Sequence, residues 1–330
     1  MNFDFTEDQT EIARTARELL AKRSGWESVR EHANGRSYDD ALWRELCELG
    51  WPGIAVAEQH GGAGLGVVEL AILCEQVGFA LAAVPLLGTA AAALVLEQAG
   101  SAAQRDRWLS GLAAGDLRGT VGTRELLPDG DGADVVIVLE EQTALVGTGG
   151  LEPLETIDPT RRYARVTDLS SFEELPGDVA AGVARAAVAT SAELVGISQR
   201  ALDMTVAYVK ERRQFDMPIG AFQAVSHKCA GMLLDAEGAR SATYFAAWAA
   251  DGAPERLTEG AAVAKAAASD AACRVTADAI QAHGGIGFTW EADLHWLFKR
   301  AQVSAQHLGG SHFHRVRLAA LAAATLARSA

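Results

Sequence analysis

The chain has 330 residues, a hydrophobic content of 49% and a formal net charge of −14. This length exceeds one minimal core and predicts two or three packed units. The acidic balance excludes nucleic acid as the main partner, because phosphate backbones are bound by clustered lysine and arginine. It leaves room for an anionic cofactor in a local pocket.

The cysteines are widely separated, and no two of them form a C-x-x-C pair. This spacing argues against a disulfide framework and a zinc site, and it fits a reducing cytoplasm. The opening MNFDFTEDQTE is acidic and lacks the basic, then apolar pattern of a signal peptide. We therefore expect a cytoplasmic protein. The four cysteines are Cys47, Cys74, Cys229 and Cys273.

The first third of the chain carries helical patterns. Thr6 and Gln9 have the spacing of a capping box before an apolar helical face. A second helix is expected over 39–49, ending at Gly50, and further helices follow the loop EQHGGAGLG up to about residue 115.

An uncharged stretch, residues 79–96, is nearly long enough to cross a membrane. Pro85 and Gly88 interrupt it, and much of it is alanine, which is only weakly apolar. The stretch therefore predicts two buried pieces that separate at Pro85, and no membrane span.

The middle of the chain changes character. Residues 134–150 and 161–169 carry β-branched runs punctuated by glycine, aspartate and proline, which predict short strands. The alanine-rich remainder predicts a four-helix bundle, with helices near 180–211, 219–251, 255–283 and 292–328.

The order of these patterns predicts a mainly α fold with a small β insert, built from separate packed units. We expect an N-terminal helical domain over residues 1–117, a reduced β domain over 118–178 and a C-terminal four-helix bundle over 179–330.

Two glycine-rich stretches fail as dinucleotide fingerprints. In VGTGGLEP the third glycine position of G-x-G-x-x-G is Glu152, and HGGAGLG fails at Val67. The first is interpreted as a β-turn.

Three histidines lie in AQHLGGSHFHR, residues 305–315. His307 and His314 align on a helix, His312 aligns with neither, and two glycines interrupt the helix. No acidic residue is present to orient an imidazole, as metal-binding histidines usually require. We expect no metal site here, and histidines at the surface or at an interface.

Two other stretches indicate a ligand. YVKERRQFDMPIGAFQ (208–223) offers a guanidinium that can hold a pyrophosphate and an aromatic ring that can flank a purine. QAHGGIGFTWE (281–291) offers glycines for close backbone approach and Gln281 for an amide or adenine edge. Taken singly, each also fits a purely structural role, as a helix-start region and as a glycine-rich helix corner.

Taken together, R-x-x-F-x-x-x-I-x-x-F-Q and Q-x-x-G-G-x-G-F resemble the acyl-CoA dehydrogenase family. The opening MNFDFTEDQ and residues 42–66 and 85–115 are similar to the same family. The resemblance covers nearly the whole chain except its middle, and it implies an FAD-dependent oxidoreductase.

In this family a carboxylate removes the α-proton of an acyl-CoA thioester, and the β-hydrogen leaves as hydride to the flavin. The resemblance implies a dimer of dimers in which the ADP end of FAD reaches a neighbouring subunit. It assigns the pyrophosphate to Arg212. It assigns the adenosine side and an adjoining backbone turn to Gln214, Phe215, Gln223, Gln281, Gly284, Gly285 and Gly287.

The rest of the family pattern is absent. Asp216 stands where the family usually has glycine, and the loops that hold the flavin ring are not found. The usual catalytic base falls on Leu308, and the alternative base position falls on Ala186. Neither residue accepts a proton, so no catalytic residue is assigned.

Three hypotheses follow. The chain is a subunit of a heteromeric (α2β2) acyl-CoA dehydrogenase in lipid or steroid catabolism, and a longer partner supplies the base and the acyl pocket. Such a complex would act on a bulky or steroid side-chain CoA and pass electrons to an electron-transfer flavoprotein or similar acceptor. Alternatively, the chain is self-sufficient with a displaced base such as Glu193, or it is a non-catalytic scaffold.

Overall fold

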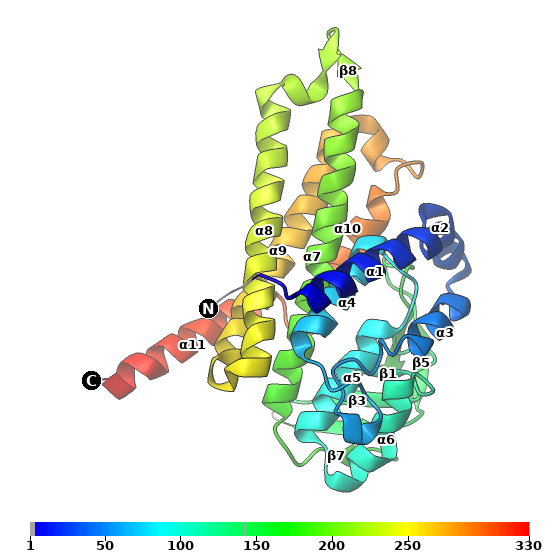
Figure 1. Ribbon diagram of the computed structural model, residues 1–330, viewed down its shortest axis with the longest axis vertical. Coiled ribbons are helices and arrows are strands. Elements are labelled where there is room, and N and C mark those ends of the chain that lie inside the picture. Colours follow the sequence, from blue (N-terminus) through cyan, green and yellow to red (C-terminus); the bar gives the residue numbers. More distant parts are fainter. Residues whose placement is uncertain (1–3, 142, 330) are drawn as a thin grey trace.

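The computed structural model describes residues 4–141 and 143–329, and it is mainly helical with a small β part, as expected (Figure 1). Thr6 and Gln9 form the expected capping box at the start of the first helix. The N-terminal helices are α1 (Glu7–Arg23), α2 (Trp26–Gly35), α3 (Asp40–Glu48), η1 (Glu58–His60), α4 (Val67–Ala80), α5 (Leu86–Ala99) and α6 (Ala102–Ala114).

The uncharged stretch 79–96 is divided as predicted. Helix α4 ends at Ala80, and α5 begins at Leu86, directly after Pro85. Both helices are buried: α4 packs against α7 and α1, and α5 packs against α7 and strand β1.

The strands form two small sheets beside α5 and α6. One sheet has the order β1-β3-β4-β7 with β1 parallel to β3, and the other has the antiparallel order β2-β6-β5. Gly149 and Gly150, both at positive φ, form the predicted turn between β4 and β5. The strands are β1 (Gly119–Gly122), β2 (Leu127–Pro128), β3 (Val135–Leu139), β4 (Ala144–Gly147), β5 (Leu151–Leu154), β6 (Tyr163–Val166) and β7 (Glu173–Glu174).

The C-terminal half is a helical bundle around α7. The prediction of one helix over 292–328 is wrong: α10 ends at Ser304 and α11 begins at Ser311. Leu308 and Gly309, in the link between these two helices, have left-handed φ of 57° and 96°, and this conformation prevents one continuous helix. The helices are α7 (Val179–Glu211), α8 (Gln223–Gly252), η3 (Pro254–Arg256), α9 (Leu257–His283), α10 (Leu294–Ser304) and α11 (Ser311–Ser329).

Helix α7 is the axis of the fold. Its buried residues pack against α4 and α5 at one end and against α8, α9 and α10 along its length. Within the part of the chain that the structure describes, α7 is the one helix long and apolar enough to cross a membrane by length and composition. Its most apolar stretch is 78% buried inside the fold, as expected for a core helix.

Helix α11 leaves the body of the molecule. Its first turns pack against α9, and the rest projects away from the bundle (Figure 1).

Candidate functional site

A short hairpin connects α7 to α8 at one end of the bundle. Strands β8 (Arg213–Gln214) and β9 (Met217–Pro218) pair there, and η2 (Ile219–Ala221) follows. The hairpin turn consists of Phe215 and Asp216, both left-handed with φ of 51° and 63°. Glycine adopts this region without cost, which gives a physical reason for the glycine that the family usually has at position 216.

The backbone of Arg212 is fixed, and its side chain is free. Its N–H donates to the carbonyl of Tyr208 at 2.8 Å, and its carbonyl accepts from the N–H of Ile219 at 2.8 Å. The guanidinium is exposed and has no protein partner among residues 4–141 and 143–329. A fixed backbone with an unpaired cation suits the binding of an anion from outside the chain.

The other predicted residues of the hairpin also face solvent. Phe215 is 89% exposed, and its ring meets that of Phe222 edge-on, with centroids 6.2 Å apart. Gln223 is exposed at the first position of α8, and Gln214 donates to the neighbouring carbonyl of Arg213 at 2.8 Å. An exposed ring and exposed amides can contact an adenosine.

The second predicted stretch begins at the end of α9, where η4 (Gly284–Phe288) follows directly. Gly284 has φ +64°, and a Cβ at Gly284 or Gly285 would meet no atom within 4 Å. A Cβ at Gly287 would lie 2.4 Å from the carbonyl oxygen of Ile280. Gly287 therefore closes a helix corner, whereas the backbone at 284–285, beside the exposed Gln281, is open to a ligand.

The two stretches lie at the same end of the bundle. The ring of Tyr208, in the last turn of α7, stacks on that of His283 with centroids 4.1 Å apart. Its hydroxyl donates to the carbonyl of His283 at 3.3 Å. A free guanidinium, an exposed aromatic ring, exposed amides and open glycines thus gather there, and they fit the ADP half of FAD. We call these residues the nucleotide end: Arg212, Gln214, Phe215, Gln223, Gln281, Gly284, Gly285 and Gly287.

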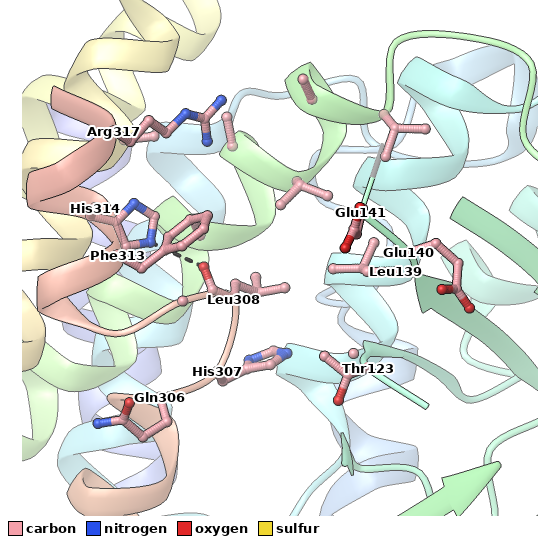
Figure 2. Close-up of a pocket in the computed structure, with 18 of the residues that line it drawn as sticks. Thr123, Leu139, Glu140, Glu141, Gln306, His307, Leu308, Phe313, His314 and Arg317 are labelled. Carbon is pink, nitrogen blue, oxygen red and sulfur yellow. Dashed lines mark hydrogen bonds between the residues drawn. The ribbon is translucent and has the colours of Figure 1, made fainter. Parts of the chain in front are cut away.

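A pocket of about 680 Å³ lies near the opposite end of α7, between the β part and the bundle. Leu308, at the family's base position, lines it together with the first turns of α7 and α11 (Figure 2). The carboxylates that line this Leu308 pocket are those of Glu140 and Glu141, both exposed on the β3–β4 connection. Ala186, at the alternative base position, is fully buried and does not line it.

Two of the three histidines near Leu308, His307 and His314, are buried, contrary to the prediction of surface or interface residues. His307 is buried, and its Nε2–H donates to the carbonyl of Val121 at 2.8 Å. His314 is also buried, and its Nε2–H donates to the carbonyl of Leu308 at 3.0 Å (Figure 2). Burial lowers the pKa of each to about 4, so both are neutral and structural. His312 is exposed, and the described residues contain no group that could hold a metal ion.

Glu193 is part of a buried ion cluster and is not a free base. Its Oε1 lies 2.5 Å from Nη2 of Arg161 and 3.0 Å from Nη1 of Arg300, and its Oε2 accepts from the hydroxyl of Ser304 at 3.0 Å. Burial acts to raise the pKa of Glu193, but the two guanidiniums outweigh it and lower the pKa. The hypothesis of a displaced base at Glu193 is therefore not supported by this geometry.

The buried ion cluster joins all three parts of the chain. Arg161 also pairs with Asp129 at 3.2 Å, and Arg300 pairs with Asp158 at 2.7 Å. The hydroxyl of Tyr38, beside α3, donates to Asp129 at 3.0 Å. We define the cluster as Asp129, Asp158, Arg161, Glu193 and Arg300, all less than 5% exposed.

A buried lysine holds the link between α10 and α11. Lys265 of α9 donates to the carbonyls of Ala305 and Gly309 at 2.9 and 3.0 Å and to the hydroxyl of Ser269 at 2.9 Å. Burial lowers its pKa to about 7. These bonds fix the segment that carries Leu308.

Sequence reasoning missed Arg300 and Lys265, although a signal was present. Arg300 lies on the apolar face of α10, between Leu297 and Ala301, and Lys265 lies in an alanine run. A lone charge on an apolar helical face indicates a buried partner. The identity of the buried partner of Arg300 could not be inferred from the sequence, because Glu193 lies 107 residues from Arg300.

The Leu308 pocket and the nucleotide end are far apart in one chain. Ala184 lines the Leu308 pocket, and Arg212 directly follows α7. At 1.5 Å per residue, the helix between them spans about 40 Å.

Comparison with known proteins identifies the family. The model described as "Acyl-CoA dehydrogenase, N-terminal domain" matches residues 6–116, and "Acyl-CoA dehydrogenase, C-terminal domain" matches residues 179–322. The chain belongs to the acyl-CoA dehydrogenase family, whose members are FAD-dependent oxidoreductases.

Among its relatives, acyl-CoA dehydrogenase IpdE2 of Mycobacterium tuberculosis is 39% identical over 311 residues, which cover 92% of this chain and 93% of that one. Acyl-CoA dehydrogenase FadE34 of the same organism is 35% identical over 342 residues, covering 95% of this chain but 47% of that one. The solved Tcur3481–Tcur3483 steroid ACAD contains a chain with a TM-score of 0.87 and 29% identity, with 97% of this chain and 99% of that one covered.

Proposed function

We propose that this chain is the short subunit of a heteromeric, FAD-dependent acyl-CoA dehydrogenase. It holds the ADP half of FAD, and a longer partner subunit supplies the flavin-ring site, the acyl pocket and the catalytic carboxylate. The observation that carries the proposal is the contrast between the two ends of α7. The nucleotide end offers a free guanidinium, whereas Leu308 occupies the base position of a retained pocket.

The absence of a base supports the first part of this proposal. Removal of an α-proton needs a proton acceptor within hydrogen-bond reach of the substrate. Leu308 and Ala186 cannot accept a proton, and Glu193 is engaged by Arg161 and Arg300. Glu140 and Glu141 are exposed, and within residues 4–141 and 143–329 no ion pair or side-chain hydrogen bond positions their carboxylates.

The nucleotide end supports the second part. The Arg212 guanidinium would pair with the pyrophosphate, and Phe215, Gln214 and Gln223 would contact the adenosine side. The open backbone at Gly284 and Gly285, with Gln281, would close over the same ligand. FAD, when bound, supplies the acceptor for the hydride that leaves the β-carbon. The role of this chain is to bind and orient the nucleotide.

The comparisons support a paired assembly and a substrate class. FadE34 is about twice as long as the segment that matches this chain, so its remaining half has room for a second subunit of this kind. The Tcur3481–Tcur3483 structure is named a steroid ACAD. We therefore favour a bulky acyl-CoA, such as a steroid side-chain thioester, with an electron-transfer flavoprotein or similar carrier as acceptor. The free cysteines fit a cytoplasmic setting.

The test is the flavin content and assembly mass of the chain, purified alone and together with a full-length family member encoded nearby. We expect a colourless chain alone, and a yellow complex with about one FAD per pair of unlike subunits. A chain that is yellow and dehydrogenates an acyl-CoA by itself would overturn the proposal. A complex whose flavin content is unaffected by Arg212→Ala would favour a scaffold.

A further inference from the structure

A small cavity lies where α1, α2, α4 and α7 meet, and it shares no residue with the nucleotide end or the Leu308 pocket. Its volume is about 130 Å³. A water molecule occupies about 30 Å³ in the liquid, so the cavity has room for a few waters or one small ion, and not for a nucleotide. Arg17 of α1 and Arg200 of α7 both line it. We call it the arginine cavity.

Aromatic rings fix the positions of the two guanidiniums. The Cζ atom of Arg17 lies 3.5 Å from the centre of the Phe79 ring, and that of Arg200 lies 5.1 Å from the same centre. Arg200 also lies over the ring of Trp26, at 5.2 Å. A guanidinium held over a ring keeps N–H groups for other partners. Among the described residues, Nε of Arg17 donates to the side-chain oxygen of Gln76.

Neither guanidinium has a counter-ion in the described part of the chain. Arg17 and Arg200 form no ion pair within residues 4–141 and 143–329. Burial lowers the pKa of both arginines, because the acidic side chains that act on them do not offset the loss of water. Each of these acids is engaged with another residue. They are Glu75, bound to Arg240 at 2.9 Å, Asp203, bound to Gln199 at 2.7 Å, and Asp293, bound to Arg30 at 2.6 Å.

A purely structural stack does not account for this pair of arginines. Two cations around one ring repel each other, and the repulsion grows as water is excluded from between them. Elsewhere in the chain, the buried Arg161 and Arg300 both pair with Glu193, at 2.5 and 3.0 Å. An anion between Arg17 and Arg200 would offset both charges in the same way.

The start of α2 adds to the attraction for an anion. Its N-cap is Gly25, which has no side chain to accept hydrogen bonds from the first N–H groups of the helix. Gly25 and Trp26 line the arginine cavity. Unpaired N–H groups and the positive end of the helix dipole both favour a bound anion. The two arginines set the position of the site, and this helix end reinforces it.

We propose that the arginine cavity binds a phosphate group, either as free phosphate or as a small phosphate monoester, between the guanidiniums of Arg17 and Arg200. A phosphate monoester carries about 1.5 to 2 negative charges at pH 7, which matches two guanidiniums better than the single charge of chloride or of a carboxylate. Its oxygens accept bidentate hydrogen bonds from guanidinium N–H groups. The bound group would tie α1 and α2 to α7. This site is separate from the proposed cofactor site and does not depend on the heteromeric assembly.

The test is calorimetric titration of the purified chain with inorganic phosphate, in an Arg212→Ala background that removes the guanidinium of the nucleotide end. We expect Arg17→Gln and Arg200→Gln each to weaken phosphate binding at least about tenfold, because charge-assisted hydrogen bonds are lost. Lys22→Gln removes an exposed charge from the same helix α1, and it should change the affinity less than about twofold. Glycerol 3-phosphate distinguishes the two sources: equal binding indicates a site open to monoesters, and weaker binding indicates a site for free phosphate.

Thermal unfolding and hydrogen exchange separate a phosphate site from a packing role. Phosphate should raise the melting temperature above its value in sodium chloride of equal ionic strength, and it should slow amide exchange in the first turn of α2. Both effects should vanish in Arg200→Gln. Arg200→Lys keeps a cation over Phe79 but not the planar fork of donors. Its melting temperature without phosphate should therefore match that of the wild type, while its phosphate affinity falls.

Three results would overturn the proposal. The first is a wild-type chain whose melting temperature responds to phosphate no more than to sodium chloride. The second is phosphate binding that Arg17→Gln and Arg200→Gln both leave unchanged, since the arginines would then only pack against Phe79. The third is an equal loss of affinity in Lys22→Gln, which would show that general charge, and not the arginine cavity, attracts the anion.

Discussion

Arg300 of α10 and Glu193 of α7 lie 3.0 Å apart in the interior, with 107 residues of chain between them. This pair closes the buried ion cluster and ties the helix that carries the Leu308 link to the axis of the fold. Removing one partner of a buried ion pair leaves the other charge uncompensated, and this typically costs about 3 to 5 kcal/mol.

Glu193→Gln is therefore expected to act on stability and not on proton abstraction. It leaves Arg161 and Arg300 without a shared carboxylate, and we expect a loss of about 3 kcal/mol in the free energy of unfolding. Urea denaturation of the purified chain measures this loss. Glu18→Gln, which removes an exposed partner of Arg14, should cost less than about 0.5 kcal/mol. A fully stable Glu193→Gln variant would contradict the structural role.

Arg212→Ala is expected to weaken flavin retention in the mixed complex. The loss of charge-assisted hydrogen bonds to a pyrophosphate corresponds to about a 10- to 100-fold weaker affinity. Equilibrium dialysis against FAD would measure it. Lys210→Ala removes an exposed cation at the same end of α7 without removing the guanidinium, and it should change affinity less than about threefold. Equal effects of the two variants would show that only general charge matters.

Asp216→Gly should raise the stability of the hairpin and the affinity of the nucleotide end for FAD. Asp216 has φ 63°, a region in which a non-glycine residue costs about 1 kcal/mol, and its carboxylate stands next to the residues expected to hold phosphate. We expect higher thermal stability and a few-fold tighter FAD binding. Asp216→Asn removes the charge but keeps a side chain, so it should give the affinity gain with little gain in stability.

His307 should make the fold sensitive to mild acid. Burial lowers its pKa from 6.5 to about 4, so the unfolded chain binds a proton first as the pH falls. The contribution of His307 to the free energy of unfolding is fully present above pH 6.5 and is lost as the pH falls from about 6.5 to 4. Comparison of urea unfolding at pH 7 and pH 4.5 should show a smaller difference for His307→Gln than for the wild type. The exposed His312→Gln should behave like the wild type.

Lys265 should make the free energy of unfolding depend on pH in the alkaline range. Its pKa falls from 10.5 to about 7, so the unfolded chain retains the proton longer as the pH rises. The free energy of unfolding is therefore expected to increase between about pH 7 and 10, and Lys265→Met should lack this increase. The methionine also removes the lysine donor of the Gly309 carbonyl, and it leaves the Ala305 carbonyl with the hydroxyl of Ser269 as its donor. In Lys265→Met, amide hydrogen exchange should therefore be faster than in the wild type over residues 305–311, and unchanged in α4.

The order of helices, strands and helices could be predicted, because the periodicity that distinguishes them is local. The break at Leu308 had a signal in Gly309 and Gly310, but the helical spacing continues on both sides of these glycines, and a single helix over 292–328 was therefore predicted wrongly. The chemistry of the nucleotide end could be proposed from two short stretches, each of which keeps its residues close in sequence. The buried ion cluster could not be predicted, because its pairs form only when α7, α10 and the β part pack together.

The length of α7 bears on how such a chain can evolve. One chain cannot bring its own Arg212 to its own Leu308 pocket, because about 40 Å of rigid helix separates them. In the assembly that we propose, the two ends of each chain would therefore lie at two different cofactor sites. A gene copy can accumulate changes at the pocket end while selection on the nucleotide end continues undiminished, because that end serves a neighbour. Division of labour between two diverged copies is then a direct outcome of helix geometry.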